Sequence, residues 1–366
     1  MAALPLTTVA GQVLVAGFRG LEPPADLVAA AQQERVGGFI LFRRNLQEPA
    51  QVAGLVDRLA RTLPPERPAL MAVDQEGGRV ARLGPPVVSL PPMRAFGDGD
   101  DVERTHRAAR LLGCQLRALG FTMDLAPVLD VDTNPANPVI GDRSFGREPD
   151  RVIRHGLAFA DGLHEGGVLS CGKHFPGHGD TELDSHFALP RVTHSRERLD
   201  RIELAPFRAA VGRLPALMTA HVVFDALDPD VPATMSPRVV TEVLRRQIGF
   251  DGLVVSDDLE MRAVADRGSI ADAAVGAVAA GCDLVLVCSR VDACLEAHEA
   301  LVRQAEKDVG FANKLREAAL RSIALRRPRP PRPVTDPDAL REALLPGETE
   351  SLERDMTALD VPGGGP

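Results

Sequence analysis

The segment KHFPGHGDTELDSH, residues 173–186, gathers three of the chain's nine histidines on one glycine-containing stretch. They are His174, His178 and His186. Imidazole side chains at this density could hold a metal ion, with Asp184 completing the coordination shell. The proline and glycines between them disfavour the helix that metal-binding HxxxH spacing normally needs. A polar surface loop without a chemical role is the simplest alternative.

Asp184 and His186 offer a third interpretation, because they lie two residues apart. On an extended segment such residues point the same way. A carboxylate that accepts from one imidazole nitrogen fixes the tautomer and leaves the other nitrogen to exchange protons. This spacing is typical of a general acid/base pair that works near neutral pH.

A second motif, VDQEGGRVARL (73–83), places Asp74 directly after an apolar run. An aspartate there often caps the next helix, but it could equally accept hydrogen bonds from two neighbouring sugar hydroxyls. The paired glycines allow the backbone to turn sharply or to approach a ligand closely. Arg79 or Arg82 could then donate to that ligand.

A third motif, GFDGLVVSDDLEM (249–261), ends an apolar run with two adjacent carboxylates. One of them could cap the helix that follows, and the other could act as a nucleophile. Strand alternation places Asp257 on the face of Leu253 and Val255, opposite Asp258. Alternation alone does not say which face points inward.

Short apolar runs alternate with stretches of helical spacing, which predicts a parallel sheet covered by helices. Eight such units in about 300 residues match the size of a (β/α)8 barrel. A doubly wound open sheet is the alternative, but no GxGxxG follows the first run. The predicted strands are 11–18, 36–42, 69–75, 121–130, 167–174, 216–224, 252–258 and 282–289. Helical spacing is clearest in 49–63, 102–120 and 152–167.

Ionisable side chains follow several of these strands, where a barrel places its active site. The third strand ends in Asp74, the fifth in Lys173 and His174, and the sixth in His221. The seventh ends in the 257–258 carboxylate pair, and the fourth precedes a long loop containing IGDRSFG (140–146). This coincidence predicts a site at that end of a single barrel.

Composition narrows the class of protein. A net charge of −9 argues against nucleic acid as a partner. The five cysteines are an odd number without a CxxC pair, which predicts reduced thiols. The N-terminus lacks the pattern of a secretion signal, and no segment resembles a membrane span. We therefore expect a soluble cytoplasmic protein, with a monomer favoured. Trp and Tyr are absent.

The chain changes character after residue 325. Residues 1–325 would form the barrel, and 326–366 a Pro/Arg-rich extension that is partly disordered. Within the extension, 326–337 is expected to be a solvated linker and 338–345 a short helix.

Five motifs, taken in order, resemble glycoside hydrolase family 3, in its single-domain β-N-acetylhexosaminidase (NagZ-type) branch. The resemblance runs from about residue 8 to 325. The motifs are VDQEGGRVARL, APVLDVDTNPANPVIGDRSFG, KHFPGHGDTELDSH, MTAHVVFDALD with PATMSP, and GFDGLVVSDDLEM.

The resemblance implies residue roles and a substrate class. Asp257 would be the nucleophile that forms a glycosyl-enzyme intermediate, His186 the general acid/base and Asp184 its partner. The implied sugar-binding residues are Asp74, Arg82, Arg143, Lys173 and His174. His178 matches the motif but has no direct role, and is expected to shape the loop. The implied substrate is a terminal β-linked N-acetylglucosamine on peptidoglycan-derived muropeptides released during cell-wall recycling, with no metal or organic cofactor.

Other activities stay open beside this one. A phosphorylase or a β-glucosidase of the same family would share the barrel and Asp257. A metal-dependent hydrolase would use His174, His178 and His186 as ligands. A non-catalytic sugar-binding protein would keep Asp74 and Arg143 but would need no nucleophile.

Overall fold

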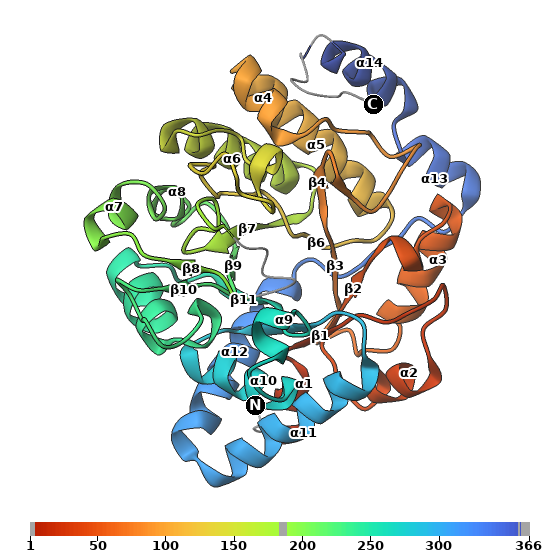
Figure 1. Ribbon diagram of the computed structural model, residues 1–366. Coiled ribbons are helices and arrows are strands. Elements are labelled where there is room, and N and C mark those ends of the chain that lie inside the picture. Colours follow the sequence, from red (N-terminus) through yellow and green to blue (C-terminus); the bar gives the residue numbers. More distant parts are fainter. Residues whose placement is uncertain (1–3, 183–188, 358, 360–366) are drawn as a thin grey trace.

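A closed barrel of eight parallel strands forms the centre of the molecule, which confirms the predicted (β/α)8 architecture (Figure 1). The computed structural model describes residues 4–182, 189–357 and 359. In order around the barrel, the strands are β1 (Leu14–Ala16), β12 (Leu284–Val287), β11 (Leu253–Asp258), β9 (Ala216–Thr219), β7 (Leu169–Phe175), β6 (Met123–Asp124), β3 (Leu70–Val73) and β2 (Gly38–Leu41). Each of the eight predicted runs contributes one of them.

The barrel closes between its first and last strands. Leu14 of β1 pairs with Val285 of β12, and the register continues to Ala16 and Val287. The strands are apolar throughout because one face packs inside the barrel and the other packs against helices. In β11, Leu253 and Val255 join the apolar cluster that fills the barrel, whereas Val254 belongs to the core under the helices.

This division fixes the direction of β11 as far as Val255, because its pairing with β12 shifts register between Val255 and Asp258. Asp257 lines a pocket together with Met218 and Leu286, which belong to the apolar cluster inside the barrel. It is therefore on the interior side of the barrel, at the carboxyl end of its strand.

Helices surround the barrel (Figure 1), and the three stretches with the clearest helical spacing are helical. The helices are α1 (Leu6–Gly11), α2 (Ala25–Gln32), α3 (Pro49–Ala60), α4 (Met93–Gly99), α5 (Val102–Ala118), α6 (Pro149–Glu165), α7 (Arg196–Arg201), α8 (Ala205–Ala209), α9 (Arg262–Ala265), α10 (Ile270–Ala280), α11 (Val291–Lys307) and α12 (Val309–Arg326). Local chemistry fixes their starts: Asp101 accepts from Arg104 N at the start of α5, and Pro149 occupies the first turn of α6.

Short strands and helical turns lie in the segments that connect the barrel strands and helices. β4 (Gln75–Gly77) and β5 (Val80–Ala81) form an antiparallel pair, and β8 (Arg191–Val192) pairs with β10 (Val223–Phe224). Three 3-10 turns are η1 (Arg43–Asn45), η2 (Gly141–Arg143) and η3 (Ala233–Met235), and η4 (Arg238–Ile248) is a π-helix.

Arg326, the last residue of α12, is buried at the amino-terminal end of the barrel. Its guanidinium donates to the carbonyl oxygen of Gly37, before β2, and to the side-chain oxygen of Gln12, before β1. The end of the last barrel helix is thereby tied to the first two strands.

We expect Arg326→Ala to lower the free energy of unfolding by about 3 kcal/mol, because it leaves a cavity and removes donors from two buried oxygens. Urea unfolding followed by circular dichroism measures the change. Arg327→Ala is the matched control, since Arg327 is exposed and follows directly. Equal midpoints for the two variants would contradict the assignment.

The C-terminal extension contains two helices, α13 (Pro337–Ala343), which matches the predicted short helix, and α14 (Pro346–Met356). Both contact α5, and α13 also contacts α3 (Figure 1). Gln115 of α5 donates to the carbonyl oxygen of Leu344 at 2.7 Å and to Thr349 Oγ1 at 2.8 Å. The Pro/Arg-rich segment before α13 is also held at Val334, whose N–H donates to Ala118 O. Residues 327–336 are nevertheless all exposed or half-buried. Residues 360–366 lie outside the described part of the chain.

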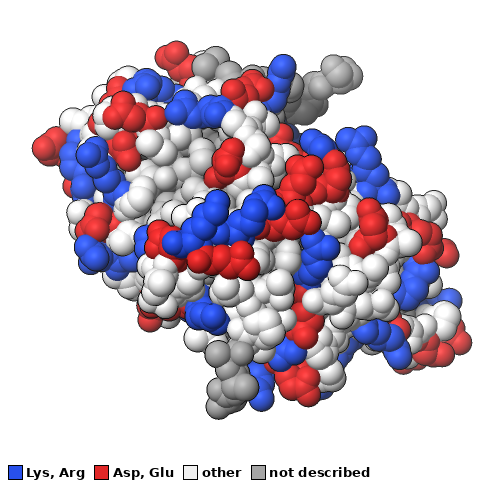
Figure 2. All heavy atoms as spheres, turned by 90° about the horizontal axis from the view of Figure 1, so that it is seen from below, with Lys and Arg blue, Asp and Glu red and all other residues white. Residues whose placement is uncertain are grey.

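Positive and negative side chains lie next to one another on the face shown in Figure 2, without a continuous basic patch there. All five cysteines are unpaired, as predicted, and four of them are buried. In the ranges that the structure describes, no helix combines the length and the apolar character needed to cross a bilayer.

Candidate active site

A pocket lies at the carboxyl ends of the barrel strands, where this fold positions its functional side chains. It is bounded by residues that end or follow β3, β7 and β11, by the β4–β5 pair and by the loop after β6. Its ionisable lining residues are Asp74, Glu76, Arg82, Arg143, Lys173, His174, His178, Asp257 and Asp258. All five residues predicted to bind sugar therefore share one pocket with the predicted nucleophile.

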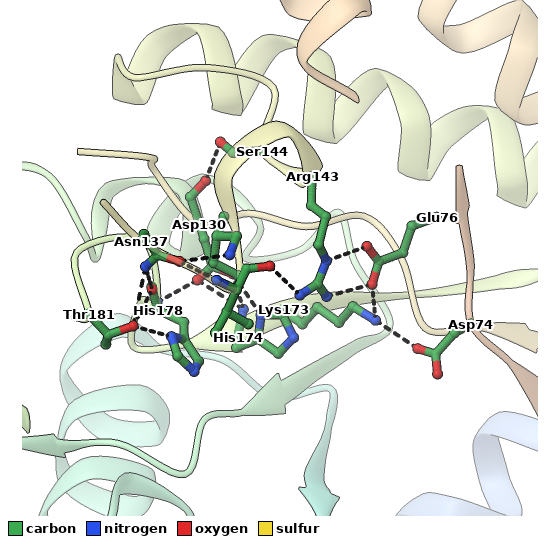
Figure 3. Close-up of polar contacts among 12 residues, drawn as sticks. Asp74, Glu76, Asp130, Asn137, Arg143, Ser144, Lys173, His174, His178 and Thr181 are labelled. Carbon is green, nitrogen blue, oxygen red and sulfur yellow. Dashed lines mark hydrogen bonds and ion pairs between the residues drawn. The ribbon is translucent and has the colours of Figure 1, made fainter. Parts of the chain in front are cut away.

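Charged side chains form a continuous ion cluster in this pocket (Figure 3). Lys173 Nζ lies 2.8 Å from Asp74 Oδ1 and 2.5 Å from Glu76 Oε1. Arg143 donates from Nε and Nη2 to the two oxygens of Glu76, at 2.8 Å each. Arg82 Nη2 extends the cluster, 3.3 Å from Asp74 Oδ2.

The inner part of this ion cluster stays charged. Burial alone would raise the pKa of Glu76, but Arg143 and Lys173 hold it well below its usual range. Burial alone would lower the pKa of Lys173, yet Asp74 and Glu76 raise it above its usual value. Glu76 is thus a carboxylate and Lys173 an ammonium at neutral pH.

The members of the ion cluster differ in how far their side chains are exposed. The side chains of Glu76 and Lys173 are 1% and 3% exposed, whereas those of Asp74 and Arg82 are 14% and 28% exposed. Asp74 and Arg82 therefore present polar atoms to the pocket, and Glu76 holds Lys173 and Arg143 in place. Hydroxyl groups of a sugar match such an edge of mixed donors and acceptors.

Asp130 fixes the start of the histidine-rich stretch. It is fully buried, and its Oδ2 lies 2.6 Å from Nδ1 of His174. It also accepts from the backbone N–H of His174 and, at 2.6 Å, from that of His178. Because Nδ1 of His174 faces this carboxylate, Nε2 is the ring nitrogen that remains for a ligand in the pocket.

His178 shapes the loop, as expected. Its Nδ1 lies 2.7 Å from Thr181 Oγ1, and Asn137 donates to its carbonyl oxygen at 2.8 Å. Burial and the neighbouring His174 lower the pKa of His178 to about 4, so the ring is neutral at physiological pH. Gly179 completes the packing, since a Cβ there would lie 1.9 Å from the carbonyl oxygen of Val131.

Glu76 and Asp130 are not among the residues predicted from the sequence. Glu76 lies inside the VDQEGGRVARL motif, between Asp74 and the two glycines. Asp130 is the last residue of a predicted strand, so the rule that singled out the other strand ends applies to it as well. Both act by holding other polar groups in place.

The two adjacent carboxylates of β11 have different environments. Burial alone would raise the pKa of Asp257, but His221, His174, the N–H of Asp258 and Lys173 lower it, so Asp257 is ionised. Burial, Glu260 and Asp257 instead raise the pKa of Asp258 to about 7. Asp258 Oδ1 accepts the backbone N–H groups of Glu260 and Cys288. Asp258 therefore stabilises the turn, and Asp257 is the more acidic group of the pair.

The predicted acid/base pair, Asp184 and His186, lies outside the described residues, which exclude 183–188. Residues on both sides of that segment are held in place. Asp180 accepts from Arg198 Nη2 at 2.6 Å and contacts His194 Nε2.

Side-chain atoms that could ligate a metal ion lie close together around Asp180. Asp180, His194 and Glu203 bring such atoms within 4.8 Å of one another. Arg198 already lies against both carboxylates, 2.6 Å from Asp180 and 3.4 Å from Glu203. A guanidinium there supplies the positive charge that a cation would supply, so we interpret the group as an ion-pair network.

Comparison with known proteins identifies the family of this chain. Residues 8–321 match the model of the glycosyl hydrolase family 3 N-terminal domain. The chain belongs to glycoside hydrolase family 3. A β-hexosaminidase of Pseudomonas aeruginosa PAO1 is 43% identical over 255 residues, which cover 69% of this chain and 75% of that protein.

Two solved structures extend the family 3 comparison. A family 3 β-N-acetylglucosaminidase from Paenibacillus sp. FPU-7 superposes with a TM-score of 0.87 at 43% identity, covering 93% of this chain and 68% of that one. NagZ from Neisseria gonorrhoeae gives a TM-score of 0.71 at 34% identity, covering 85% and 98%. This family 3 chain is a glycosidase of the β-N-acetylhexosaminidase type.

Proposed function

We propose that this glycosidase removes terminal β-linked N-acetylglucosamine from peptidoglycan-derived muropeptides with retention of configuration. The observation that supports the proposal best is the ionised, inward-facing Asp257 in one pocket with the ion cluster and His174. A charged carboxylate beside groups suited to sugar hydroxyls is what a retaining glycosidase requires. The relatives named β-hexosaminidase and β-N-acetylglucosaminidase favour the acetamido sugar.

In the proposed first step, an oxygen of Asp257 bonds to the anomeric carbon while the bond to the leaving-group oxygen breaks. His186 gives its proton to that departing oxygen, and Asp184 stabilises the imidazolium before transfer. In the second step, water attacks the same carbon, His186 takes the water's proton, and the electron pair returns to Asp257.

Sugar binding is proposed for Asp74, Arg82, Arg143, Lys173 and His174. Support comes from their shared pocket and from the partial exposure of Asp74 and Arg82. Arg143 is tied to Glu76 on both carboxylate oxygens, so its own position is fixed before a ligand arrives.

The biological setting is part of the proposal. We propose a cytoplasmic monomer that acts on recycled cell-wall fragments without a metal or organic cofactor. Residues 1–325 would form the catalytic unit and 326–366 an extension of it. The similarity to NagZ favours this setting.

The test compares release of 4-nitrophenol from the β-N-acetylglucosaminide and from the β-glucoside, with wild type and His186→Ala. We expect preference for the acetamido sugar and loss of most turnover in the variant, because the leaving group then lacks its proton donor. His106→Ala, at a partly exposed histidine of α5, is the control.

Three outcomes would overturn parts of the proposal. Glucoside turnover that survives His186→Ala would remove both the acid/base and the substrate assignment. Sugar 1-phosphate formed on adding phosphate would indicate a phosphorylase. Loss of activity with a chelator would indicate a metal-dependent hydrolase.

A further inference from the structure

His221, one of the ionisable residues predicted at a strand end, occupies a buried position near the proposed nucleophile and has no role in the proposed function. It follows β9, the strand next to β11 in the barrel, and is fully buried. Its Nε2 lies 3.0 Å from the main-chain oxygen of Asp258, and its Nδ1 lies 2.9 Å from Thr234 Oγ1. Both ring nitrogens are therefore engaged by oxygen atoms.

The partners allow both ring nitrogens to carry protons. A carbonyl oxygen only accepts, so Nε2 must carry a proton to bond Asp258 O. Thr234 has a single hydroxyl proton, and its oxygen lies 3.0 Å from the carbonyl oxygen of Ala220 and 2.9 Å from Thr219 Oγ1. When Thr234 donates that proton to Ala220 O, its own oxygen accepts a proton from Nδ1 as well.

A ring with both nitrogens protonated is an imidazolium, and here it would lie close to the half-buried carboxylate of Asp257. His221 is the strongest of the charged neighbours that favour the ionised form of Asp257. The same ring holds the main chain of Asp258, whose N–H donates to Asp257 Oδ1 at 2.8 Å. One side chain thus acts on the nucleophile through charge and through the backbone.

We propose that His221 is a positioning residue, a permanently protonated counter-ion that keeps Asp257 ionised and fixes its orientation. The inference rests on the proposed function, in which Asp257 attacks the anomeric carbon. It adds a group that stays charged through the reaction and does not itself transfer a proton to the substrate.

The second chemical step should depend on this charge most. When water attacks the anomeric carbon, the bond to Asp257 breaks and the electron pair returns to its oxygen. A nearby imidazolium stabilises that departing carboxylate. The covalent intermediate therefore breaks down more slowly once the charge is removed.

The principal test is His221→Gln, which keeps a donor for Asp258 O but removes the charge. We expect the acid limb of kcat/KM for 4-nitrophenyl β-N-acetylglucosaminide to move up by about one pH unit, because Asp257 without the cation has a higher pKa. We also expect a burst of 4-nitrophenol that wild type lacks, since deglycosylation slows.

The matched control is His298→Gln. His298 is also buried, with Nε2 2.8 Å from the carbonyl oxygen of Thr7, but it packs among the outer helices, facing Arg35. The same substitution there should leave the acid limb in place. Among the described residues, other titratable groups that interact with Asp257 are Cys171, Lys173, His174, His178, Asp258 and Cys288, and they are unchanged in both variants.

A direct measurement keeps the inference testable if the Gln variant folds poorly. In wild-type protein labelled with 15N-histidine, both ring nitrogens of His221 should have shifts of protonated nitrogens at pH 7. Thr234→Val removes the acceptor for Nδ1 and should shift that resonance. A shift of an unprotonated nitrogen in wild type would overturn the inference.

A labelling experiment distinguishes a failure of the proposed role of His221 from a failure of the proposed function. A 5-fluoro glycosyl fluoride of N-acetylglucosamine should label Asp257 in wild type, as found by peptide mass spectrometry. Labelling elsewhere would remove the proposed function. Labelling of Asp257 together with an unmoved acid limb and no burst in His221→Gln would overturn the role of His221 alone.

Discussion

Asp257→Ala should lower kcat on 4-nitrophenyl β-N-acetylglucosaminide by roughly 10⁴-fold or more, since removal of a catalytic nucleophile has effects of this size. The variant keeps the pocket but has no group to form the covalent intermediate. Sodium azide should restore part of the turnover, because the small anion fits the space left by the carboxylate. The product expected is the α-glycosyl azide, formed by attack from the face that Asp257 occupied.

Variants of neighbouring acids make this result specific. Asp258→Ala should lose activity because it disturbs the turn that Asp258 stabilises. Azide should not restore this activity, because Asp258 does not face the anomeric carbon in the proposed reaction. Asp251→Ala, at an exposed position just before β11, should behave like wild type. Azide rescue of Asp258→Ala instead of Asp257→Ala would exchange the assignment of the two carboxylates.

Lys173→Met should lower the free energy of unfolding by about 3–5 kcal/mol, as expected when one partner of a buried ion pair is removed. Lys173 lies between Asp74 and Glu76, and the substitution leaves these two carboxylates facing each other with less compensating charge. Urea unfolding at pH 7 measures the loss. Lys307→Met, at an exposed end of α11, is the matched control.

A second substitution tests the cause of that loss. Adding Asp74→Asn to Lys173→Met removes one of the uncompensated charges, so the double variant should recover part of the stability. Substrate binding should not recover, because the proposed sugar contacts of both residues are gone. A loss below about 1 kcal/mol in Lys173→Met would mean that the ion cluster is solvated.

The barrel could be predicted because each strand has a local sequence pattern. Apolar runs such as 252–258 alternate with stretches of helical spacing. Their order around the barrel, and the closure of β1 on β12, depend on contacts between distant segments. The same limit applies to Asp257. Alternation along β11 is interrupted by a register shift between Val255 and Asp258, so its inward direction required the pocket that Asp257 lines.

The site residues missed in the sequence share one physical property. Glu76 and Asp130 are buried carboxylates whose partners lie far along the chain, Arg143 for the first and His174 for the second. Nothing in a local pattern distinguishes such a group from a helix cap. His221, in contrast, stands at a predicted strand end, but its role depends on the main chain of another strand. The roles of Asp184 and His186 stay predictions from the family resemblance.

The tie between Arg326 and the residues before β1 and β2 also bears on how the chain folds as it is synthesised. The first strand emerges from the ribosome early, whereas its partner β12 and its anchor Arg326 emerge late. Until then both edges of the growing sheet are unpaired, and unpaired strand edges can pair with other chains. Folding of this barrel is therefore dominated by contacts of long sequence separation, which makes closure a slow and late event.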